Sequence, residues 1–403
     1  MPVPERRTRW DLTAAAVLAV AVLAVATALW WTSDARRTTL STAAGPAPAV
    51  PAEQPLPTAL AEIWRAPSPA TAVPVVQGAT VVTAAAGEVA GRDLVSGSIR
   101  WSYRRDLALC TVAAAFDRVA ALYQRGETCS EVTTLRWADG GRGAQRSGPV
   151  EAPTRLTADG DQAATTGRRY LEVWRSDLVR TLTYGRLPTP AQPKTQPRPE
   201  CTHGSTALDS GRLAVIEHCP AEGSVRLTVQ RSHPKEPDQP EVDFSTPLPG
   251  DQARVVALSP QRVAVALPSP ARLLVFDARG NQVAEHPLSV PNAELQGDPP
   301  RGLSAVTETP TGLYWFTGSA TIALDAGNLR PRWTRLATLG PGSVVDGRLL
   351  VPTPGALSVL DITTAEQIAA LPVDRGGYRG PVMIATSGGV VLEQRGDTLV
   401  ALR

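Results

Sequence analysis

The chain has 403 residues, enough for one large domain or two to three ordinary ones. Its 40 basic residues (Lys and Arg) nearly balance its 38 acidic residues (Asp and Glu), and no basic tail or stripe stands out. This balance argues against nucleic acid as a partner. Only Lys194 and Lys235 are lysines, which we interpret as a sign of a GC-rich, actinobacterial genome and not of function.

An apolar segment near the N-terminus, Leu12–Trp31, carries no charged residue and is long enough for one membrane crossing. Three arginines precede it and two follow it, so the positive-inside rule places the N-terminus in the cytoplasm. The alternative is a cleaved signal peptide, because Ala26–Ala28 fits a small-residue cleavage site. In both interpretations the rest of the chain lies outside the cytoplasm.

The segment Val73–Leu107 contains four short apolar runs separated by glycines. Runs of this length, rich in Val and Ile and bounded by Gly and Asp, predict strands joined by tight turns. Four consecutive strands form one antiparallel meander, the unit of a β-propeller blade. The runs are Val73–Gln77, Ala79–Ala84, Glu88–Asp93 and Ser98–Tyr103.

This unit recurs along the chain, which predicts a propeller of eight blades, with seven as the alternative. The eighth unit has three runs before the chain ends, and Ala61–Arg65 supplies the fourth strand, which closes the ring and removes exposed edges. The apolar runs expected to lie innermost are Val81–Thr83, Ala120–Tyr123, Ala163–Thr166, Leu213–Ile216, Val263–Leu267, Leu313–Phe316, Leu349–Val351 and Val390–Glu393.

The spacing of Asp93, Gly97 and Trp101 resembles the blade of PQQ-type, quinoprotein-like propellers. The aspartates are expected to form turns, and the tryptophans are expected to pack between blades, although a stacking floor for a sugar or quinone is the alternative. Other positions that follow the pattern are Asp139, Asp277, Asp325, Asp361, Tyr184 and Trp333.

The order of the segments is most similar to that of the single-span propeller proteins of Actinobacteria, a largely uncharacterised family. We predict a cytoplasmic tail at 1–11, a transmembrane helix at 12–31, an Ala/Pro-rich tether at 32–59 and an exocytoplasmic propeller at 60–403. The resemblance implies a non-catalytic scaffold or binding module for a cell-envelope or membrane-protein partner.

Enzymes of the quinoprotein group use a vicinal cysteine pair and a calcium site of Glu, Asn and Asp, and neither can be placed in this sequence. No nucleophile motif or phosphate-binding loop is present either. We therefore predict no catalytic residues, no metal and no cofactor. Two alternatives remain, namely an oxidoreductase with PQQ in the central channel and a sensor of an envelope lipid or glycan.

The four cysteines fall into two pairs, each within one repeat unit. An exported chain with an even number of cysteines predicts disulfides, here Cys110–Cys129 and Cys201–Cys219. The alternative for the second pair is metal binding, because His203 and His218 lie beside its cysteines. That spacing matches no recognised zinc pattern.

Three proline-rich inserts interrupt the regular spacing of the repeats: Leu187–Glu200, Ser232–Glu241 and Pro287–Arg301. They are either solvated turns, which are tolerated at little cost, or a rim that binds a partner. For the second interpretation the candidate partner-binding residues are Lys194, Arg198, Lys235, Asp238 and Glu294.

Overall fold

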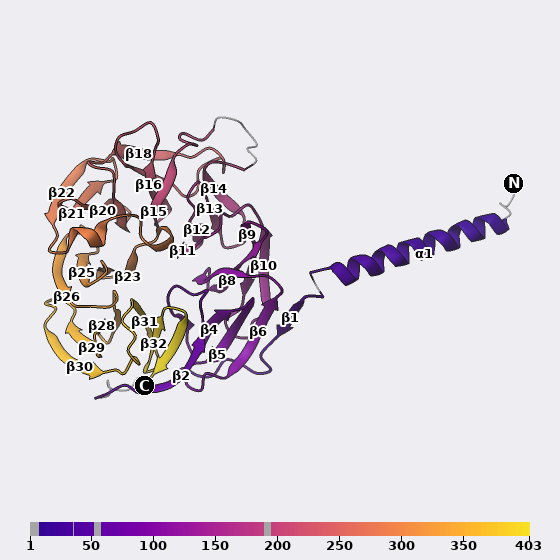
Figure 1. Cartoon of the computed structure of the whole chain (residues 1–403), viewed down its shortest axis with the longest axis horizontal. Coiled ribbons are helices and arrows are strands. Elements are labelled where there is room, and N and C mark those ends of the chain that lie inside the picture. Colours follow the sequence, from indigo (N-terminus) through magenta and orange to yellow (C-terminus); the bar gives the residue numbers. More distant parts are fainter. Residues whose placement is uncertain (1–7, 35, 52–57, 189–194) are drawn as a thin grey trace.

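The computed structural model describes residues 8–34, 36–51, 58–188 and 195–403. A long helix, α1 (Arg9–Thr32), precedes a ring of eight antiparallel sheets (Figure 1). This ring confirms the predicted eight-bladed propeller. Thr8 and Asp11 cap the helix reciprocally, since each side chain bonds to the backbone N–H of the other. By length and composition α1 could cross a membrane, and none of its residues is buried.

Each blade contains a four-stranded antiparallel meander, and blade 1 has a fifth strand, β1 (Thr38–Ser41), outside β6. Blades 1 to 4 are formed by β3 (Val75–Gln77), β4 (Thr80–Ala85), β5 (Glu88–Asp93), β6 (Ile99–Arg105); β7 (Leu109–Ala115), β8 (Arg118–Arg125), β9 (Thr128–Leu135), β10 (Arg142–Ser147); β11 (Leu156–Asp159), β12 (Gln162–Thr165), β13 (Tyr170–Arg175), β14 (Arg180–Gly185); and β15 (Thr202–Asp209), β16 (Arg212–His218), β17 (Arg226–Arg231), β18 (Val242–Pro247).

The other half of the ring has the same organisation, with two short 3-10 helices between blades 5 and 6. It contains β19 (Arg254–Leu258), β20 (Arg262–Pro268), β21 (Ala271–Asp277), β22 (Gln282–Pro287); η1 (Asn292–Leu295), η2 (Pro300–Gly302); β23 (Ala305–Thr309), β24 (Gly312–Phe316), β25 (Ala320–Asp325), β26 (Pro331–Leu336); β27 (Ser343–Val345), β28 (Arg348–Thr353), β29 (Ala356–Asp361), β30 (Gln367–Pro372); and β31 (Val382–Ser387), β32 (Val390–Arg395), β33 (Thr398–Leu402), β2 (Glu62–Pro67).

The apolar runs expected to lie innermost form the second strand of each blade, so that detail of the prediction is wrong. In blade 6, for example, all five residues of β24 are buried, whereas none of the residues of the inner strand β23 is. The inner strand has neighbouring blades on its flanks but the central channel at its edge. The second strand is covered by adjacent blades on both faces, and it therefore carries the most continuous apolar run.

Tryptophans of the outer strands join neighbouring blades, as expected. The indole Nε1 of Trp101 in blade 1 donates to the carbonyl oxygen of Trp137 in blade 2, at 2.9 Å. The same ring lies against Gly140, where a Cβ atom would come within 2.6 Å of it and where φ is +73°. Equivalent indole-to-carbonyl bonds are Trp64–Leu94 and Trp333–Ile362. These contacts show that the tryptophans of the repeat pattern pack between neighbouring blades.

The two ends of the domain meet in blade 8. Strand β2 pairs antiparallel with β33, which places Arg65 opposite Val400 and Ala66 opposite Leu399. The predicted closing strand is therefore confirmed, with bounds shifted by one or two residues.

Antiparallel pairing gives the propeller two distinct ends. The turns after the first and third strands of each blade lie at one end, which we call the Asp-turn face; neighbouring turns touch there, as in the bond from Ser210 N to Asp159 Oδ2 at 2.6 Å. The predicted turn aspartates lie at this face, and the N–H groups of Thr363 and Thr364 lower the pKa of Asp361. The opposite end carries both cysteine pairs, and we call it the disulfide face.

The predicted tether lies partly on the propeller, which composition did not predict. Strand β1 extends the open edge of β6, with Thr38 opposite Arg105 and Ser41 opposite Ser102. Farther on, Ala43 N donates to the carbonyl oxygen of Asp139 at 3.2 Å. The chain between α1 and the first blade therefore covers a sheet edge that would otherwise be exposed.

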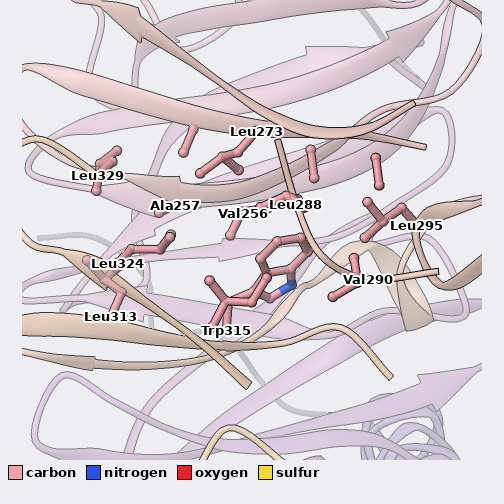
Figure 2. Packing of buried hydrophobic residues seen from close by; sticks show 14 of the residues in the cluster. Val256, Ala257, Leu273, Leu288, Val290, Leu295, Leu313, Trp315, Leu324 and Leu329 are labelled. Atoms are coloured by element: carbon pink, nitrogen blue, oxygen red, sulfur yellow. The ribbon is translucent and has the colours of Figure 1, made fainter. Parts of the chain in front are cut away.

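The insert Pro287–Arg301 contributes to the core between blades 5 and 6. Figure 2 shows Leu288, Val290 and Leu295 of the insert packed beside Trp315 of blade 6. Leu295 is completely buried. This insert is thus an integral part of the domain and not a free loop.

Candidate interaction surface

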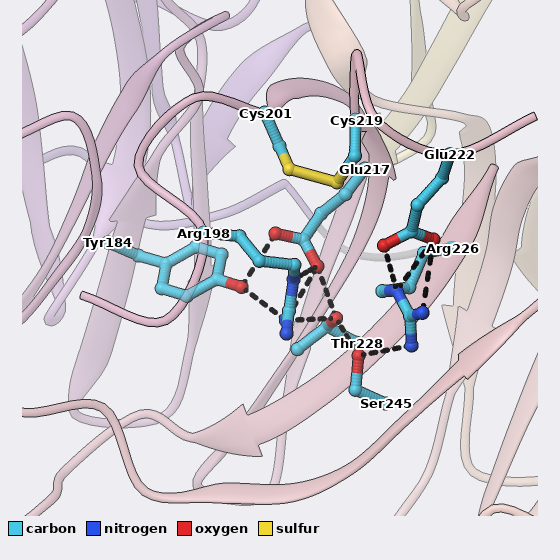
Figure 3. Close-up of a disulfide and its surroundings, with 9 residues drawn as sticks. All are labelled: Tyr184, Arg198, Cys201, Glu217, Cys219, Glu222, Arg226, Thr228 and Ser245. Carbon is cyan, nitrogen blue, oxygen red and sulfur yellow. Dashed lines mark hydrogen bonds and ion pairs between the residues drawn. A yellow bond between two sulfur atoms is a disulfide. The ribbon is translucent and has the colours of Figure 1, made fainter.

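Both predicted disulfides are present at the disulfide face. Their Cα atoms are 6.0 Å apart in Cys110–Cys129 and 4.2 Å apart in Cys201–Cys219. The first pair joins the first and third strands of blade 2, and the second joins the ends of β15 and β16 in blade 4 (Figure 3). The disulfides lie in blades 2 and 4, on either side of blade 3, and each cross-links its own blade.

The histidines beside the second pair do not form a metal site. His203 Nδ1 lies 3.2 Å from the carbonyl oxygen of Gly167, whereas His218 Nε2 lies 3.3 Å from Asp298 Oδ1. Among the described residues, no group of three or more His, Cys, Asp or Glu side chains could hold a metal ion. The sulfur atoms of Cys201 and Cys219 bond to each other.

Arg198, a predicted partner-binding residue, belongs to a buried ion pair. Its Nε donates to Glu217 Oε2 at 3.0 Å, and its Nη2 donates to the hydroxyl of Tyr184 at 3.0 Å and to that of Thr228 at 2.8 Å (Figure 3). The Glu217 side chain has no exposed surface, and Tyr184 also donates to it, at 2.7 Å. Without these partners the carboxylate would be buried with no counter-charge, which is strongly destabilising. Arg198, whose side chain is 21% exposed, therefore contributes to the fold through this ion pair.

Two of the inserts meet along the outer edge of blade 3. Thr183 N of β14 donates to the carbonyl oxygen of Pro237 at 2.7 Å. Gln196 of the other insert accepts from Gly185 N at 3.0 Å and donates to the carbonyl oxygen of Asp238 at 2.9 Å. Because both inserts cover it, β14 is almost entirely buried, unlike the other outer strands, such as β30.

We call the surface formed by Arg186 and the described parts of these two inserts, residues 187–188, 195–200 and 232–241, the blade-3 rim. Arg186, His233, Lys235 and Glu236 are exposed on it. A cavity of about 220 Å³ lies beside it. The cavity is lined by Pro149, Tyr170, Arg180, Thr183, Leu187, Pro188 and Asp238.

The predicted partner-binding residues therefore separate into different surroundings. Lys235 and Asp238 lie on the blade-3 rim, and Lys194 lies outside the described residues. Glu294 accepts hydrogen bonds from the hydroxyls of Thr317 and Ser319, which tie the third insert to blade 6. Gln196, which joins the two rim inserts, was not predicted; an amide side chain within a proline-rich loop gave no signal that set it apart.

The central channel carries acidic groups on its inner strands. Glu308 is exposed on β23, but the protein around it partly desolvates its carboxyl group; this desolvation, followed by the negative charges of Asp209 and Asp159, raises the pKa of Glu308 to about 7. These carboxylates come from blades 6, 4 and 3, whose inner strands lie nearest the centre of the ring (Figure 1). The described residues offer no donor set for calcium and no vicinal disulfide. The site of a quinoprotein enzyme therefore does not fit these residues.

Comparison with known proteins gives a fold but no family. No protein-family model and no curated protein sequence matches this chain. The crystal structure of BamB from Moraxella catarrhalis is similar, with a TM-score of 0.51, 12% identity and coverage of 85% of this chain and 99% of that chain. At this identity the similarity shows a shared propeller fold.

Two further solved structures match with lower scores. A chain of the mitotic checkpoint complex has a TM-score of 0.44 and 11% identity, covering 87% of this chain and 96% of that chain. KlHsv2 with loop 6CD replaced by a Gly-Ser linker has a TM-score of 0.43 and 8% identity, covering 72% of this chain and 90% of that chain.

Proposed function

We propose that this protein is a membrane-anchored, non-catalytic binding module that holds an envelope or membrane-protein partner on the blade-3 rim. In this proposal α1 remains uncleaved, crosses the membrane once and leaves the propeller outside the cytoplasm. Two disulfides support an oxidising compartment. The apolar composition of α1 and the absence of buried residues in it support the crossing.

The proposal rests mainly on the two inserts and the two disulfides that lie on blade 3 or beside it. The two rim inserts lie on this blade, and the two disulfides fix the blades beside it. A rigid scaffold that presents loops of its own is the usual way in which a propeller or sandwich recognises a partner. The hydrogen bonds of Gln196 hold both loops in place before binding, so less conformational entropy is lost when a partner docks.

The charges on the rim favour a specific partner. Arg186, next to the first insert, and Lys235 and Glu236, in the second insert, are exposed, and they present both signs of charge. Mixed charge on a rim contributes more to selection and to association rate than to affinity. We therefore expect charge reversal at these positions to abolish capture of the partner without disturbing the fold.

The experiment is affinity capture from solubilised native membranes with a tagged full-length chain. The rim variant carries Arg186→Glu, Lys235→Glu and Glu236→Lys. The control variant carries Arg332→Glu, Arg348→Glu and Glu366→Lys in blades 6 and 7, which changes the net charge by the same amount.

The proposal predicts that one envelope or membrane protein is enriched with the wild-type chain and with the control variant, and is lost with the rim variant. Equal enrichment with the rim variant would assign the interface to another surface. Alkaline carbonate extraction of the same membranes tests the anchor separately, because an integral chain stays in the pellet.

A further inference from the structure

A groove with a volume of about 630 Å³ opens on the disulfide face between blades 1 and 2. Four arginines line it, Arg37, Arg104, Arg105 and Arg301, and Asp106 is the only acidic residue among its described lining residues. We call it the arginine groove. Its positive charge comes from segments that are far apart in the sequence, which converge only in the folded ring.

Neutralisation of this charge within the protein is incomplete. Arg105 is paired with Glu131 at 3.3 Å and is nearly buried, so it acts structurally. Arg104, in contrast, is 62% exposed, and its closest carboxylate, that of Glu88, lies 3.9 Å away. Arg301 forms no ion pair with a described carboxylate; its Nη1 donates to the carbonyl oxygen of Cys110 at 3.4 Å.

A further arginine, Arg155, does not line the groove but lies close enough to Arg301 to feel its charge. Arg155 precedes the inner strand β11, and its Nη1 atom is buried without a hydrogen-bond partner among the described residues. Burial, followed by the nearby positive charge of Arg301, lowers the pKa of Arg155 to about 10. Two guanidinium groups with so little compensation favour an anion between or beside them.

The outer end of the groove lies next to the candidate membrane span. Helix α1 ends at Thr32, and Asp34 forms ion pairs with Arg125 and, at 3.8 Å, with Arg105 of blade 1. These pairs fix Asp34, which follows the helix, against blades 1 and 2, and the helix itself projects outward from the side of the ring (Figure 1). Arg36 lies over the Trp31 ring, with its guanidinium carbon 3.8 Å from the ring centroid, an arrangement suited to the membrane interface.

We propose that the arginine groove holds the phosphate group of an anionic phospholipid from the leaflet in which the C-terminal end of α1 lies. The inference rests on the proposed membrane crossing of α1. Arg37 lines the groove and follows the end of α1 by only a few residues, so the spacer between span and groove is short and we expect a headgroup at the membrane surface to reach it. Arginine suits this ligand because its planar fork of N–H donors matches phosphate oxygens.

The test uses the full-length chain in nanodiscs of phosphatidylcholine with or without phosphatidylglycerol. Lipid retained on the protein is measured by native mass spectrometry after transfer to detergent. The groove variant carries Arg37→Gln, Arg104→Gln and Arg301→Gln. The matched control carries Arg279→Gln, Arg332→Gln and Arg348→Gln, which remove the same charge at the Asp-turn face.

Wild-type and control chains are expected to retain phosphatidylglycerol in preference to phosphatidylcholine. The groove variant should lose affinity for it by about fivefold per arginine, because each basic residue near an anionic membrane contributes about 1 kcal/mol. Circular dichroism and intact disulfides verify that the variants are folded.

Four results would overturn the inference. Equal retention by the groove variant would show that these arginines do not hold the lipid. Binding of inorganic phosphate to the detergent-solubilised chain, with the same loss in the groove variant, would assign the groove to a free anion. If alkaline carbonate extracts the chain, the proposed anchor fails and this inference fails with it, whereas an anchored chain without lipid preference overturns this inference alone.

Discussion

Arg65 in the first strand after the tether lies directly opposite Val400, near the end of the chain, in the sheet of blade 8. This pairing closes the ring, and Trp64 beside it donates to the carbonyl oxygen of Leu94 in blade 1 at 2.9 Å. Blade 8 is thereby joined both to its own last strand and to its neighbour. A propeller without this strand would expose the edge of β33.

Deletion of Glu62–Pro67 is therefore expected to destabilise the whole propeller. Each ladder hydrogen bond that is lost costs about 1 kcal/mol, so the free energy of unfolding should fall by several kcal/mol. Thermal unfolding of the soluble domain measures this. Deletion of Thr38–Ser41 is the control, since β1 extends a blade without closing the ring, and an equally large effect of both deletions would contradict the closure argument.

The ion pair of Arg198 with Glu217 should stabilise the fold, because without Arg198 the Glu217 carboxylate would be buried with no counter-charge. Arg198→Met leaves the fully buried Glu217 carboxylate without its cation, which typically costs about 3–5 kcal/mol. Adding Glu217→Gln should recover most of this loss, because the neutral amide needs no cation, its oxygen accepts from one of the hydroxyls of Tyr184 and Thr228, and its NH2 group donates to the other. Urea denaturation of the wild type and of both variants measures these changes, and a double variant as unstable as the single one would disprove the assignment.

Glu308 should make the stability depend on pH. Its folded-state pKa of about 7 lies above the value of an unfolded glutamate, so the folded protein holds a proton that the unfolded chain releases. Stability associated with this group is full below the unfolded pKa and is lost as the pH rises through 7. Glu308→Gln, which stays neutral, should thus gain in Tm relative to the wild type between pH 5 and pH 8, and Glu366→Gln should not. A gain independent of pH would count against the raised pKa.

The disulfides should stabilise the two blades that flank blade 3. Replacing Cys201 and Cys219 by serine should lower the free energy of unfolding by about 3 kcal/mol, according to the chain-entropy model for loops of this size. Peptide mapping without reductant should recover the Cys110–Cys129 and Cys201–Cys219 links. Free thiols at these positions in the exported protein would rule out the assignment.

Much of the fold could be predicted because each blade repeats a local signal. Trp101 follows Asp93 and Gly97 at a fixed spacing, and turn chemistry and strand period are both local. Strand β1 was missed because its partner, β6, lies far along the chain and its short sequence is not distinctive. The inner strands were misplaced because burial between blades, and not closeness to the axis, selects the most apolar run.

The surroundings of the candidate residues were less predictable. Glu217 interrupts an apolar run, which is a readable sign of a buried carboxylate, but its partner Arg198 comes from an insert and is identified only in the folded structure. The arginine groove depends on Arg37, Arg104 and Arg301 meeting at one face, and no spacing in the sequence encodes that meeting. The composition of the inserts predicted that Arg198 and Glu294 lie on a partner-binding rim. In the structure the side chains of both form hydrogen bonds that hold an insert to a blade.

The most direct test of the account is site-specific photo-crosslinking in intact cells. A photo-reactive amino acid is placed at Arg186, Lys235 or Glu236 on the blade-3 rim, and at the matched exposed positions Arg332, Arg348 and Glu366 in blades 6 and 7. The account predicts one discrete crosslinked envelope or membrane protein from the rim positions, and none from the matched positions. Crosslinks of equal yield from both sets, or from blades 6 and 7 alone, would contradict it.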